Sequence, residues 1–294
     1  MERKQKIERK QKAVFPTSYR DSEQADYIQF RYIYCQCYEI KLPGGTTILT
    51  DPFISGGVDD FSVDQLEGAD YIILNHTHFD HDMDVGKVWE RFHGRIICQK
   101  EVAMEVARFF DIPYSSIYAV GEQCTYYLPE FTLQTFHGLH DNRKAREGTD
   151  KRPSQQGDTT RNRFGIEGHQ MLDLMGAVFM MNWVITTKNN FRIAFNAGQD
   201  FEEHARQLDN VRPNIMIRHR IRTYRPEEFA GQCERVGAQY ILPWHHSNAL
   251  ITGEDLNQYM DDVNKVLKEK GSTAKAFNPE PYRWYRMYLG IEGI

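Results

Sequence analysis

Residues 76–81 read His-Thr-His-Phe-Asp-His, so six consecutive positions hold four side chains that can bind a metal ion. Imidazole and carboxylate groups are ligands that zinc, iron and manganese accept. On an extended chain, His76 and His78 point to the same side and can hold one ion. If a helix follows, Asp80 and His81 can turn toward a second ion, and two ions about 3.5–4 Å apart can share a hydroxide. The spacing therefore predicts a metal centre.

Two further pairs of histidines each follow a strand-like segment: His137 and His140 after residues 131–136, and His245 and His246 after residues 240–242. The ends of neighbouring strands meet at one edge of a sheet, where ligands are commonly bound. Histidines that are far apart in the sequence can therefore converge on the same ions as the first cluster.

Strand-like and helical segments surround these histidines and must position them. Residues 71–74, directly before the motif, form an apolar run typical of a buried strand. Residues 27–50 indicate a β-meander, residues 178–196 a hairpin, and the apolar spacing in residues 100–110 a helix. Strands flanked by amphipathic helices indicate an α/β protein with sheets in the middle and helices outside.

The motif of residues 76–81 resembles the His-x-His-x-Asp-His signature of the metallo-β-lactamase-fold hydrolases and matches it in full. The resemblance extends over about residues 27–278. Within that superfamily, residues 48–53 and 241–245 look most like the ascorbate-6-phosphate-lactonase-like branch and its metal-dependent hydrolase relatives. The resemblance implies an αββα sandwich of two mixed β-sheets flanked by helices.

The resemblance also implies two divalent ions, of which the first would be held by His76, His78 and a histidine of the middle pair. We expect this third ligand to be His140, because Asp141-Asn142 follows it, as a small polar or acidic residue often follows the family's histidine. His137 is the alternative, and otherwise it would support the ligands or contact the substrate. Zinc is the expected ion, with manganese and iron as alternatives.

The second ion would be held by Asp80, His81 and one histidine of the last pair. We expect His245, because it follows Pro243-Trp244 as the family's histidine follows its own Pro-x step. His246 would then line the pocket or point into a core. Both assignments are implied by the resemblance.

The position expected to bridge the two ions departs from the family's pattern. The family places an Asp directly after a glycine, whereas here Gly198 is followed by Gln199 and then Asp200. Asp200 could still reach the ions if the backbone bends at the strand end. It could instead cap a following helix, with Glu203 completing a capping box. If Gln199 takes the bridging position, the second ion binds more weakly or the site holds one ion.

Two more residues are expected to support the site. The resemblance implies that Asp51 orients a metal-binding histidine by contacting the side of its ring that faces away from the metal. The alternative is that Asp51 initiates a turn before Pro52. His219 lies between Arg218 and Arg220, and these three could receive an anionic substrate group. A solvated strand end is the other interpretation of that triplet.

The resemblance implies a lactonase-like, metal-dependent hydrolase in which a metal-bound hydroxide attacks a lactone, amide or phosphate ester of a small substrate, either anionic or neutral. A metal ion lowers the pKa of bound water from 15.7 toward about 7, and Asp80 would orient the hydroxide. A phosphodiesterase of the same superfamily is one alternative. A degenerate metal-binding scaffold without catalysis is another, and Gln199 is the residue that suggests it.

The domain organisation follows from changes in composition along the chain. Residues 1–25 form a charged N-terminal arm, and residues 26–294 form a single metallo-hydrolase domain with a polar insertion at 142–169. The insertion is either a surface loop or a lid whose basic side chains attract an anion, namely Arg143, Lys144, Arg161 and Arg163. The arm and the aromatic tail 282–288 suggest a homo-oligomer, although a tail strand paired with its own sheet explains the tail equally well.

Composition narrows the class of partner and the compartment. The net charge of −5 argues against binding of long nucleic acids. No apolar run approaches the roughly 20 residues that span a bilayer. Five cysteines without dense spacing indicate reduced thiols in the cytoplasm. We interpret Cys35 and Cys37 as buried core thiols, with a metal site as the alternative.

Overall fold

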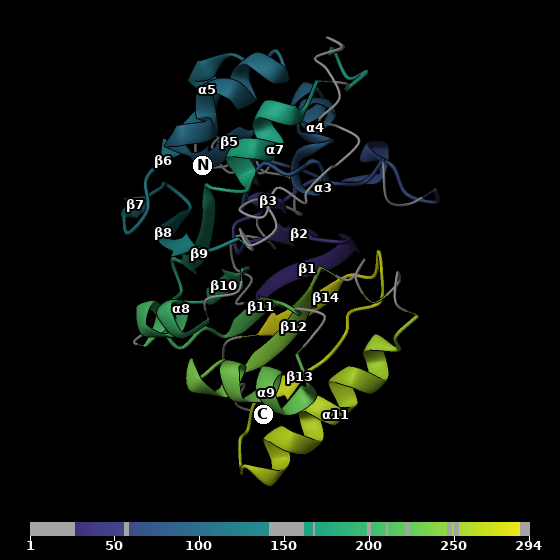
Figure 1. Cartoon of the computed structure of the whole chain (residues 1–294), viewed down its shortest axis with the longest axis vertical. Helices are drawn as coiled ribbons and strands as arrows, with labels where there is room; N and C mark the ends of the chain where they lie inside the picture. The colour runs from purple at the N-terminus through teal and green to yellow at the C-terminus, as the bar shows by residue number, and fades with distance from the viewer. Residues whose placement is uncertain are drawn as a thin grey trace, which may run out of the picture.

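A computed structural model of the protein describes residues 27–55, 59–140, 162–166, 168–198, 201–209, 211–220, 224–245, 249 and 253–288. Two seven-stranded β-sheets pack face to face in the middle of the molecule, and helices cover their outer faces (Figure 1). Both sheets are mixed. The predicted αββα sandwich is therefore confirmed.

The first sheet has the strand order β14-β1-β2-β3-β4-β5-β6. Its strands are β1 (Tyr27–Tyr34), β2 (Cys37–Lys41), β3 (Thr47–Thr50), β4 (Tyr71–Ile73), β5 (Arg95–Gln99), β6 (Ile117–Val120) and β14 (Tyr285–Tyr288). The predicted meander is present, because β1, β2 and β3 pair antiparallel in sequence order. Strands β3 to β6 are parallel. The aromatic tail supplies β14, which pairs antiparallel with β1 of the same sheet.

The second sheet has the order β13-β12-β11-β10-β9-β8-β7. Its strands are β7 (Thr125–Tyr127), β8 (Phe131–Gly138), β9 (Met180–Thr187), β10 (Arg192–Asn196), β11 (Ile215–His219), β12 (Tyr240–Trp244) and β13 (Lys275–Ala276). Strands β9 and β10 form the predicted antiparallel hairpin. Strands β10 to β13 are parallel, so β10, β11 and β12 end at the same edge of the sheet.

Aromatic side chains fill the space between the two sheets. Trp183 and Phe195 stack with ring centroids 3.7 Å apart, and Phe195 also contacts Tyr38 and Trp244. All four are fully buried, or nearly so. Burying side chains of this size supplies much of the hydrophobic stabilisation of the sandwich. The cluster also fixes the distance between the sheets, and therefore between residues at their edges.

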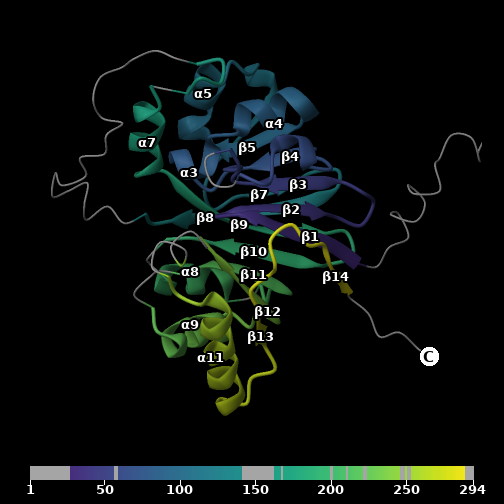
Figure 2. The ribbon, with the colours of Figure 1, turned by 90° about the vertical axis from the view of Figure 1, so that its right-hand side faces the viewer.

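Helices cover the two outer faces separately (Figure 2). The first sheet is covered by α3 (Phe79–Asp82), α4 (Val85–Phe92), α5 (Lys100–Phe109) and α7 (Gln170–Gly176), with short 3₁₀ turns at η1 (Val63–Gln65) and η2 (Tyr114–Ser116). The second is covered by α8 (Phe201–Leu208), α9 (Pro226–Arg235) and α11 (Leu256–Glu269). Helix α5 is the helix predicted at residues 100–110, and its apolar positions Val102, Val106 and Phe109 are buried.

The sequence determines where helix α11 begins and ends. The side chain of Asp255 accepts hydrogen bonds from the backbone N–H groups of Asn257 and Gln258, which satisfies donors of the first turn. Gly271, just past the end, has a φ of 71°, which glycine adopts at little cost. Within the described segments, no helix combines the length and the apolar character needed to cross a bilayer.

Candidate metal centre

Three histidines from two segments converge beside the first sheet. Donor atoms of His76, His78 and His140 lie within 4.8 Å of one another. The Nε2 atom of His76 is 3.1 Å from Nδ1 of His78, and the His140 ring lies 5.1 and 4.5 Å from these two rings, centroid to centroid. Two nitrogens on one tetrahedral zinc ion, with bonds of about 2.0–2.1 Å, are roughly 3.3 Å apart. The cluster therefore fits one ion, and it contains the expected His140.

The local fold of the motif matches the predicted change from extended chain to helix. Strand β4 ends just before the motif, and His78 is still extended, with φ −76° and ψ 151°, as the residue that precedes α3. Asn75 holds the start of the segment: its side-chain N–H donates to the Met181 carbonyl, and its Oδ1 lies 2.9 Å from Nδ1 of His76. This contact turns Nε2 of His76 toward the other histidines.

A second cluster combines Asp80 and His245 with a residue that the sequence did not identify. Donor atoms of Cys35, Asp80 and His245 lie within 4.8 Å of one another. Nε2 of His245 is 3.4 Å from Oδ2 of Asp80, and its Nδ1 is 3.9 Å from Sγ of Cys35. Cys35 is buried, as predicted, but in this cluster rather than in the apolar core that contains Cys37. The five cysteines, all within the described residues, form no disulfide.

His81 lies between an acid and an amide. Its Nδ1 is 3.1 Å from Oδ1 of the fully buried Asp51, which also accepts a hydrogen bond from the Asn75 N–H at 2.7 Å. On the other side, the Gln36 amide nitrogen lies 2.7 Å from Nε2 of His81 and donates to Asp80 at 3.2 Å. Asp51 thus contacts the Nδ1 side of His81, a histidine of the motif, as the resemblance implied.

The electrostatics hold His76, His245 and Asp80 in the protonation states that bind metals. Burial and the neighbouring histidines lower the pKa of His76 well below its usual value. Burial lowers the pKa of His245 to about 4, against the opposing effect of Asp80. Burial opposes ionisation of Asp80, but His81 and His245 lower its pKa to about 2. Burial alone would lower the pKa of His81, but Asp51 raises it. Neutral imidazole and ionised carboxylate are the metal-binding forms.

Helix α7 supports the motif from outside. The hydroxyl of Thr77 donates to the Leu172 carbonyl at 2.8 Å, and the N–H of Phe79 donates to Oδ1 of Asp173 at 3.1 Å. A Cβ atom at Gly176 would lie 2.8 Å from the backbone of Thr77, so only glycine allows this approach. The helix therefore fixes the backbone that carries the first two histidines.

A buried ion pair beneath this helix makes stability depend on pH. His169 Nε2 is 2.7 Å from Oδ1 of Asp82, and its Nδ1 is 3.3 Å from Asp173. Burial lowers the pKa of His169, but Asp82 outweighs it and raises the value to about 10. Burial raises the pKa of Asp82 even beside this histidine, so without His169 the desolvated carboxylate would lose its closest cationic partner.

We therefore expect His169→Ala to lower the free energy of unfolding by about 3 kcal/mol at pH 6. The raised pKa means that this contribution is complete below the unfolded value of about 6.5 and is lost as pH rises through about 10. Urea unfolding of both proteins at pH 6 and pH 10 measures it. An equal deficit at both pH values would contradict the pairing, and Lys188→Ala, in the exposed hairpin turn, is the control.

The remaining predicted residues lie elsewhere. His137 is exposed and pairs with Glu122 at 2.9 Å, outside both clusters. His219 stacks on His245, with centroids 4.7 Å apart, and its buried Nε2 makes no hydrogen bond to the described residues. Arg218 and Arg220 are buried, so the interpretation of this triplet as a solvated strand end is wrong. Gln199, Asp200 and His246 lie outside the described residues.

The polar insertion is described only at residues 162–166 and 168–169. Arg163 pairs with Glu90 at 2.9 Å and lies 3.6 Å from Asp111. The other basic residues predicted to attract an anion, Arg143, Lys144 and Arg161, lie outside the described residues. Arg163 therefore serves an ion pair with α4.

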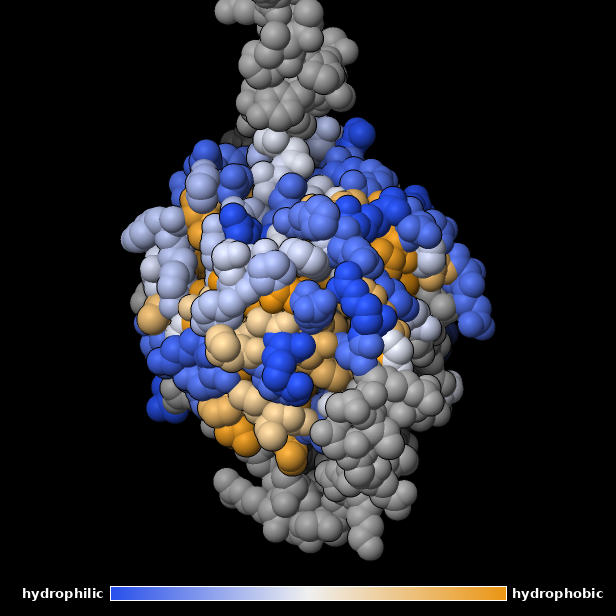
Figure 3. Space-filling view, turned by 90° about the horizontal axis from the view of Figure 1, so that it is seen from above, coloured by the Kyte–Doolittle hydropathy of each residue, from blue (hydrophilic) through white to orange (hydrophobic). Residues whose placement is uncertain are grey.

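Exposed apolar side chains flank the histidines. Phe79, inside the motif, is 40% exposed, and Leu139, just before His140, is 39% exposed. Apolar side chains also gather on the face of the molecule seen in Figure 3; exposed ones on or near α5 and α7 are Met104, Met171, Leu174 and Val178. Phe79 and Leu139 are next to metal ligands in the sequence, so they are the exposed apolar side chains nearest to the candidate centre along the chain.

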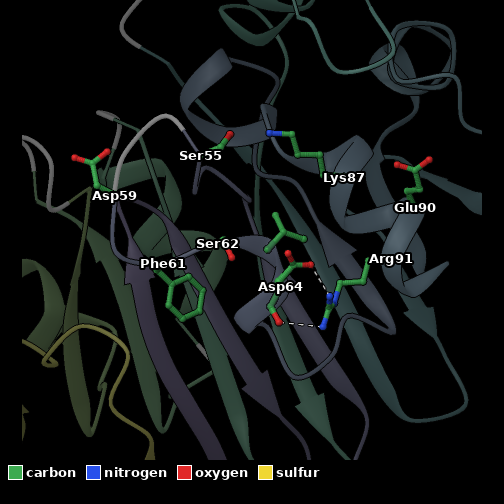
Figure 4. A pocket seen from close by; sticks show the side chains of 9 residues that line it. Ser55, Asp59, Phe61, Ser62, Asp64, Lys87, Glu90 and Arg91 are labelled. Atoms are coloured by element: carbon green, nitrogen blue, oxygen red, sulfur yellow. Dashed lines mark hydrogen bonds and ion pairs between the residues drawn. The ribbon is translucent and has the colours of Figure 1, made fainter.

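A separate pocket of about 610 Å³ lies next to α4. Its lining residues are Ser55, Asp59, Phe61, Ser62, Val63, Asp64, Lys87, Glu90 and Arg91. Arg91 donates to Asp64 at 2.7 Å across this pocket (Figure 4). None of the lining residues belongs to the two donor clusters, so the pocket is distinct from the candidate metal centre.

The sequence of the chain is similar to those of known metal-dependent hydrolases. The profile of the Metallo-beta-lactamase superfamily matches residues 32–158. A UPF0173 metal-dependent hydrolase of Listeria innocua is 24% identical over 237 residues, covering 80% of this chain and 92% of the relative. One of Aeropyrum pernix is 39% identical over 61 residues, covering 20% of this chain and 25% of the relative. The chain spans about a quarter to a half of the first curated relatives it matches.

Solved structures agree on the fold. Igni18, a metallo hydrolase from the hyperthermophilic archaeon Ignicoccus hospitalis KIN4/I, superposes with a TM-score of 0.64 at 12% identity. The superposition covers 90% of this chain and 100% of the other. The chain has the metallo-β-lactamase fold, and its sequence is similar to the Metallo-beta-lactamase superfamily over residues 32–158 and to UPF0173 metal-dependent hydrolases.

Proposed function

We propose that the protein is a metal-dependent hydrolase. The observation that carries this proposal is the cluster of His76, His78 and His140 next to Asp80 and His245. The lowered pKa values of His76, Asp80 and His245 keep these three groups in metal-binding form. When bound, zinc or another divalent ion supplies hydroxide near neutral pH and polarises the oxygen of the scissile group. The printed names of the UPF0173 relatives support the same chemistry.

Different residues of the chain would bind the ions, orient the attacking water and support the ligands. His76, His78 and His140 would hold the first ion, and Asp80, His81 and His245 would hold the second. His81 would bind through Nε2, which lies 2.7 Å from the Gln36 amide nitrogen, so this amide would have to move aside. Asp80 is ionised and about one-fifth exposed, so its free oxygen can accept a hydrogen bond from the attacking water and orient it. Asp51 keeps His81 in the tautomer that presents Nε2.

We propose a small substrate with a lactone, amide or phosphate ester group, as in the lactonase-like branch that the sequence resembles. The exposed Phe79 and Leu139 favour an apolar group next to the scissile bond. A substrate panel should therefore vary the scissile group and the apolar group independently, in neutral and anionic forms.

The test combines metal content with hydrolysis. Protein purified without chelator is measured by plasma mass spectrometry, stripped, and reconstituted with zinc, manganese or iron(II). Each form is assayed with lactones, amides and bis(p-nitrophenyl) phosphate. We expect bound metal, activity that disappears on stripping, and recovery with one of the ions. Full activity of the stripped protein would refute the proposal, and bound metal without hydrolysis of the panel would favour a metal-binding scaffold.

A further inference from the structure

We propose that the thiolate of Cys35 is a direct ligand of the second ion, together with Asp80 and His245. This inference rests on the proposed metal-dependent function. Its starting point is the second donor cluster, in which sulfur, carboxylate oxygen and imidazole nitrogen lie within 4.8 Å of one another. These are the three donor types that zinc accepts in proteins.

The separations are slightly larger than those of ligands on one ion. With Zn–S of about 2.3 Å and Zn–N and Zn–O of about 2.0–2.1 Å, tetrahedral geometry places sulfur roughly 3.6 Å and oxygen roughly 3.3 Å from the nitrogen. In the structure, Nδ1 of His245 is 3.9 Å from Cys35 Sγ, and Nε2, the other nitrogen of the same ring, is 3.4 Å from Oδ2 of Asp80. With one donor atom per residue, the three donors lie within 4.8 Å of one another, so the His245 ring must rotate to bring one nitrogen to an ion shared with Cys35 and Asp80.

Backbone contacts hold the two partners in place. The N–H of His245 donates to the Cys35 carbonyl at 3.1 Å, and the indole N–H of Trp244 donates to the Gln36 carbonyl at 3.0 Å. The hydroxyl of Tyr38 donates to the Pro243 carbonyl at 2.8 Å. These three hydrogen bonds, which we call the turn clamp, join the turn between β1 and β2 to the end of β12.

Strained backbone at both ligands points to the same conclusion. Cys35 has a φ of 53° and His245 a φ of 68°, values that side chains other than glycine adopt at a cost. Such conformations persist where the surroundings enforce them, and they are common at functional sites. Here they aim the cysteine sulfur and the imidazole at each other across the two sheets.

The surroundings suit an ion that must also bind substrate. Cys35 is 1% exposed, whereas the side chains of Asp80 and His245 are about one-fifth exposed. Sulfur therefore closes the inner side of the site, and the outer side stays open. A thiolate and a carboxylate together balance the charge of a divalent ion. A sulfur ligand also favours zinc over manganese or magnesium, which prefer oxygen.

Cys37 provides a matched control two residues away. It is fully buried in the apolar cluster under the helices, and burial raises the pKa of its thiol well above the usual value. It belongs to neither donor cluster. Replacing either cysteine with serine makes the same chemical change, but only Cys35→Ser removes a donor from the metal centre.

The test uses cobalt(II), which replaces zinc and absorbs in the near ultraviolet when a thiolate binds it. Wild-type protein and Cys37→Ser loaded with cobalt should show this charge-transfer band, and Cys35→Ser should lack it. A neutral thiol that binds zinc as the thiolate releases its proton, so zinc titration of Cys35→Ser should release one proton fewer per chain. Its affinity for the second zinc ion should fall at least about tenfold. Circular dichroism confirms folding, and Cys35→Ala serves as a second variant.

The outcomes separate this inference from the proposed function. Cobalt binding without a charge-transfer band in the wild type, or a band that survives in Cys35→Ser, overturns the role of Cys35 and leaves the hydrolase proposal standing. Folded wild-type protein that binds neither cobalt nor zinc overturns both. If both Cys35→Ser and Cys37→Ser lose the band, its loss does not depend on which thiol is removed. That result would also overturn the role of Cys35.

Discussion

Asp80→Asn should lower kcat/KM for the substrate found in the panel by about 1,000-fold or more. The carboxylate is ionised, with a pKa of about 2, and lies 3.4 Å from His245. Asparagine keeps the size of the side chain but removes the charge that attracts the second ion. It also replaces one hydrogen-bond acceptor of the attacking water with a donor. Steady-state kinetics with matched metal loading measure the effect.

Two measurements show that this loss is chemical. Asp261, exposed on α11, gives a control variant, Asp261→Asn, that should keep wild-type kinetics. Because the lowered pKa of Asp80 means that the folded protein stabilises the ionised carboxylate, the metal-free Asp80→Asn protein should unfold at a lower temperature than the metal-free parent, and the kinetics are therefore measured well below its unfolding midpoint. An Asp80→Asn protein that retains more than about a tenth of the activity would show that Asp80 neither binds the ion nor orients water.

His140→Ala should abolish tight binding of the first ion, with zinc affinity reduced by at least about 100-fold, and should bring hydrolysis to the detection limit. Among the residues that the structure describes, three side chains form the first cluster, and two histidines alone do not complete a zinc site. Equilibrium dialysis with zinc, followed by plasma mass spectrometry, measures occupancy directly.

His137→Ala is the matched control, because it removes a histidine only three positions away. That side chain is exposed and paired with Glu122, so its loss should change stability by about 0–1 kcal/mol and leave zinc content unchanged. The reverse result, with metal lost in His137→Ala and kept in His140→Ala, would reassign the third ligand.

The parts of the fold that could be predicted are those determined by residues close together in the sequence. The motif of residues 76–81 contains its own geometry, since an extended pair of histidines followed by one helical turn places all four side chains on one side. The meander, the β9–β10 hairpin and helix α5 also follow from patterns within a few residues. The choice of His140 came from the family's pattern, and the structure brings this residue to His76 and His78.

Contacts between distant segments could not be predicted in the same way. Cys35 resembles a core cysteine because it follows a buried strand, and only the three-dimensional fold brings it to His245, 210 positions later. A register shift between Tyr32 and Tyr34 precedes the turn that carries Cys35, so strand periodicity alone misplaces the side chain. Likewise, nothing near Gln36 indicates that its amide lies between Asp80 and His81.

The turn clamp has a consequence for how this protein acquires its metal. It joins the beginning of the first sheet to the end of the second, so its donors meet only after nearly the whole sandwich has formed. A chain still folding, or one opened at either sheet, has the histidine motif but not the complete second site. Metal binding is therefore coupled to completion of the fold. At free ion concentrations 100-fold above Kd it adds about 2.7 kcal/mol to stability. Metal depletion would thus lengthen the time that this chain spends open to proteases.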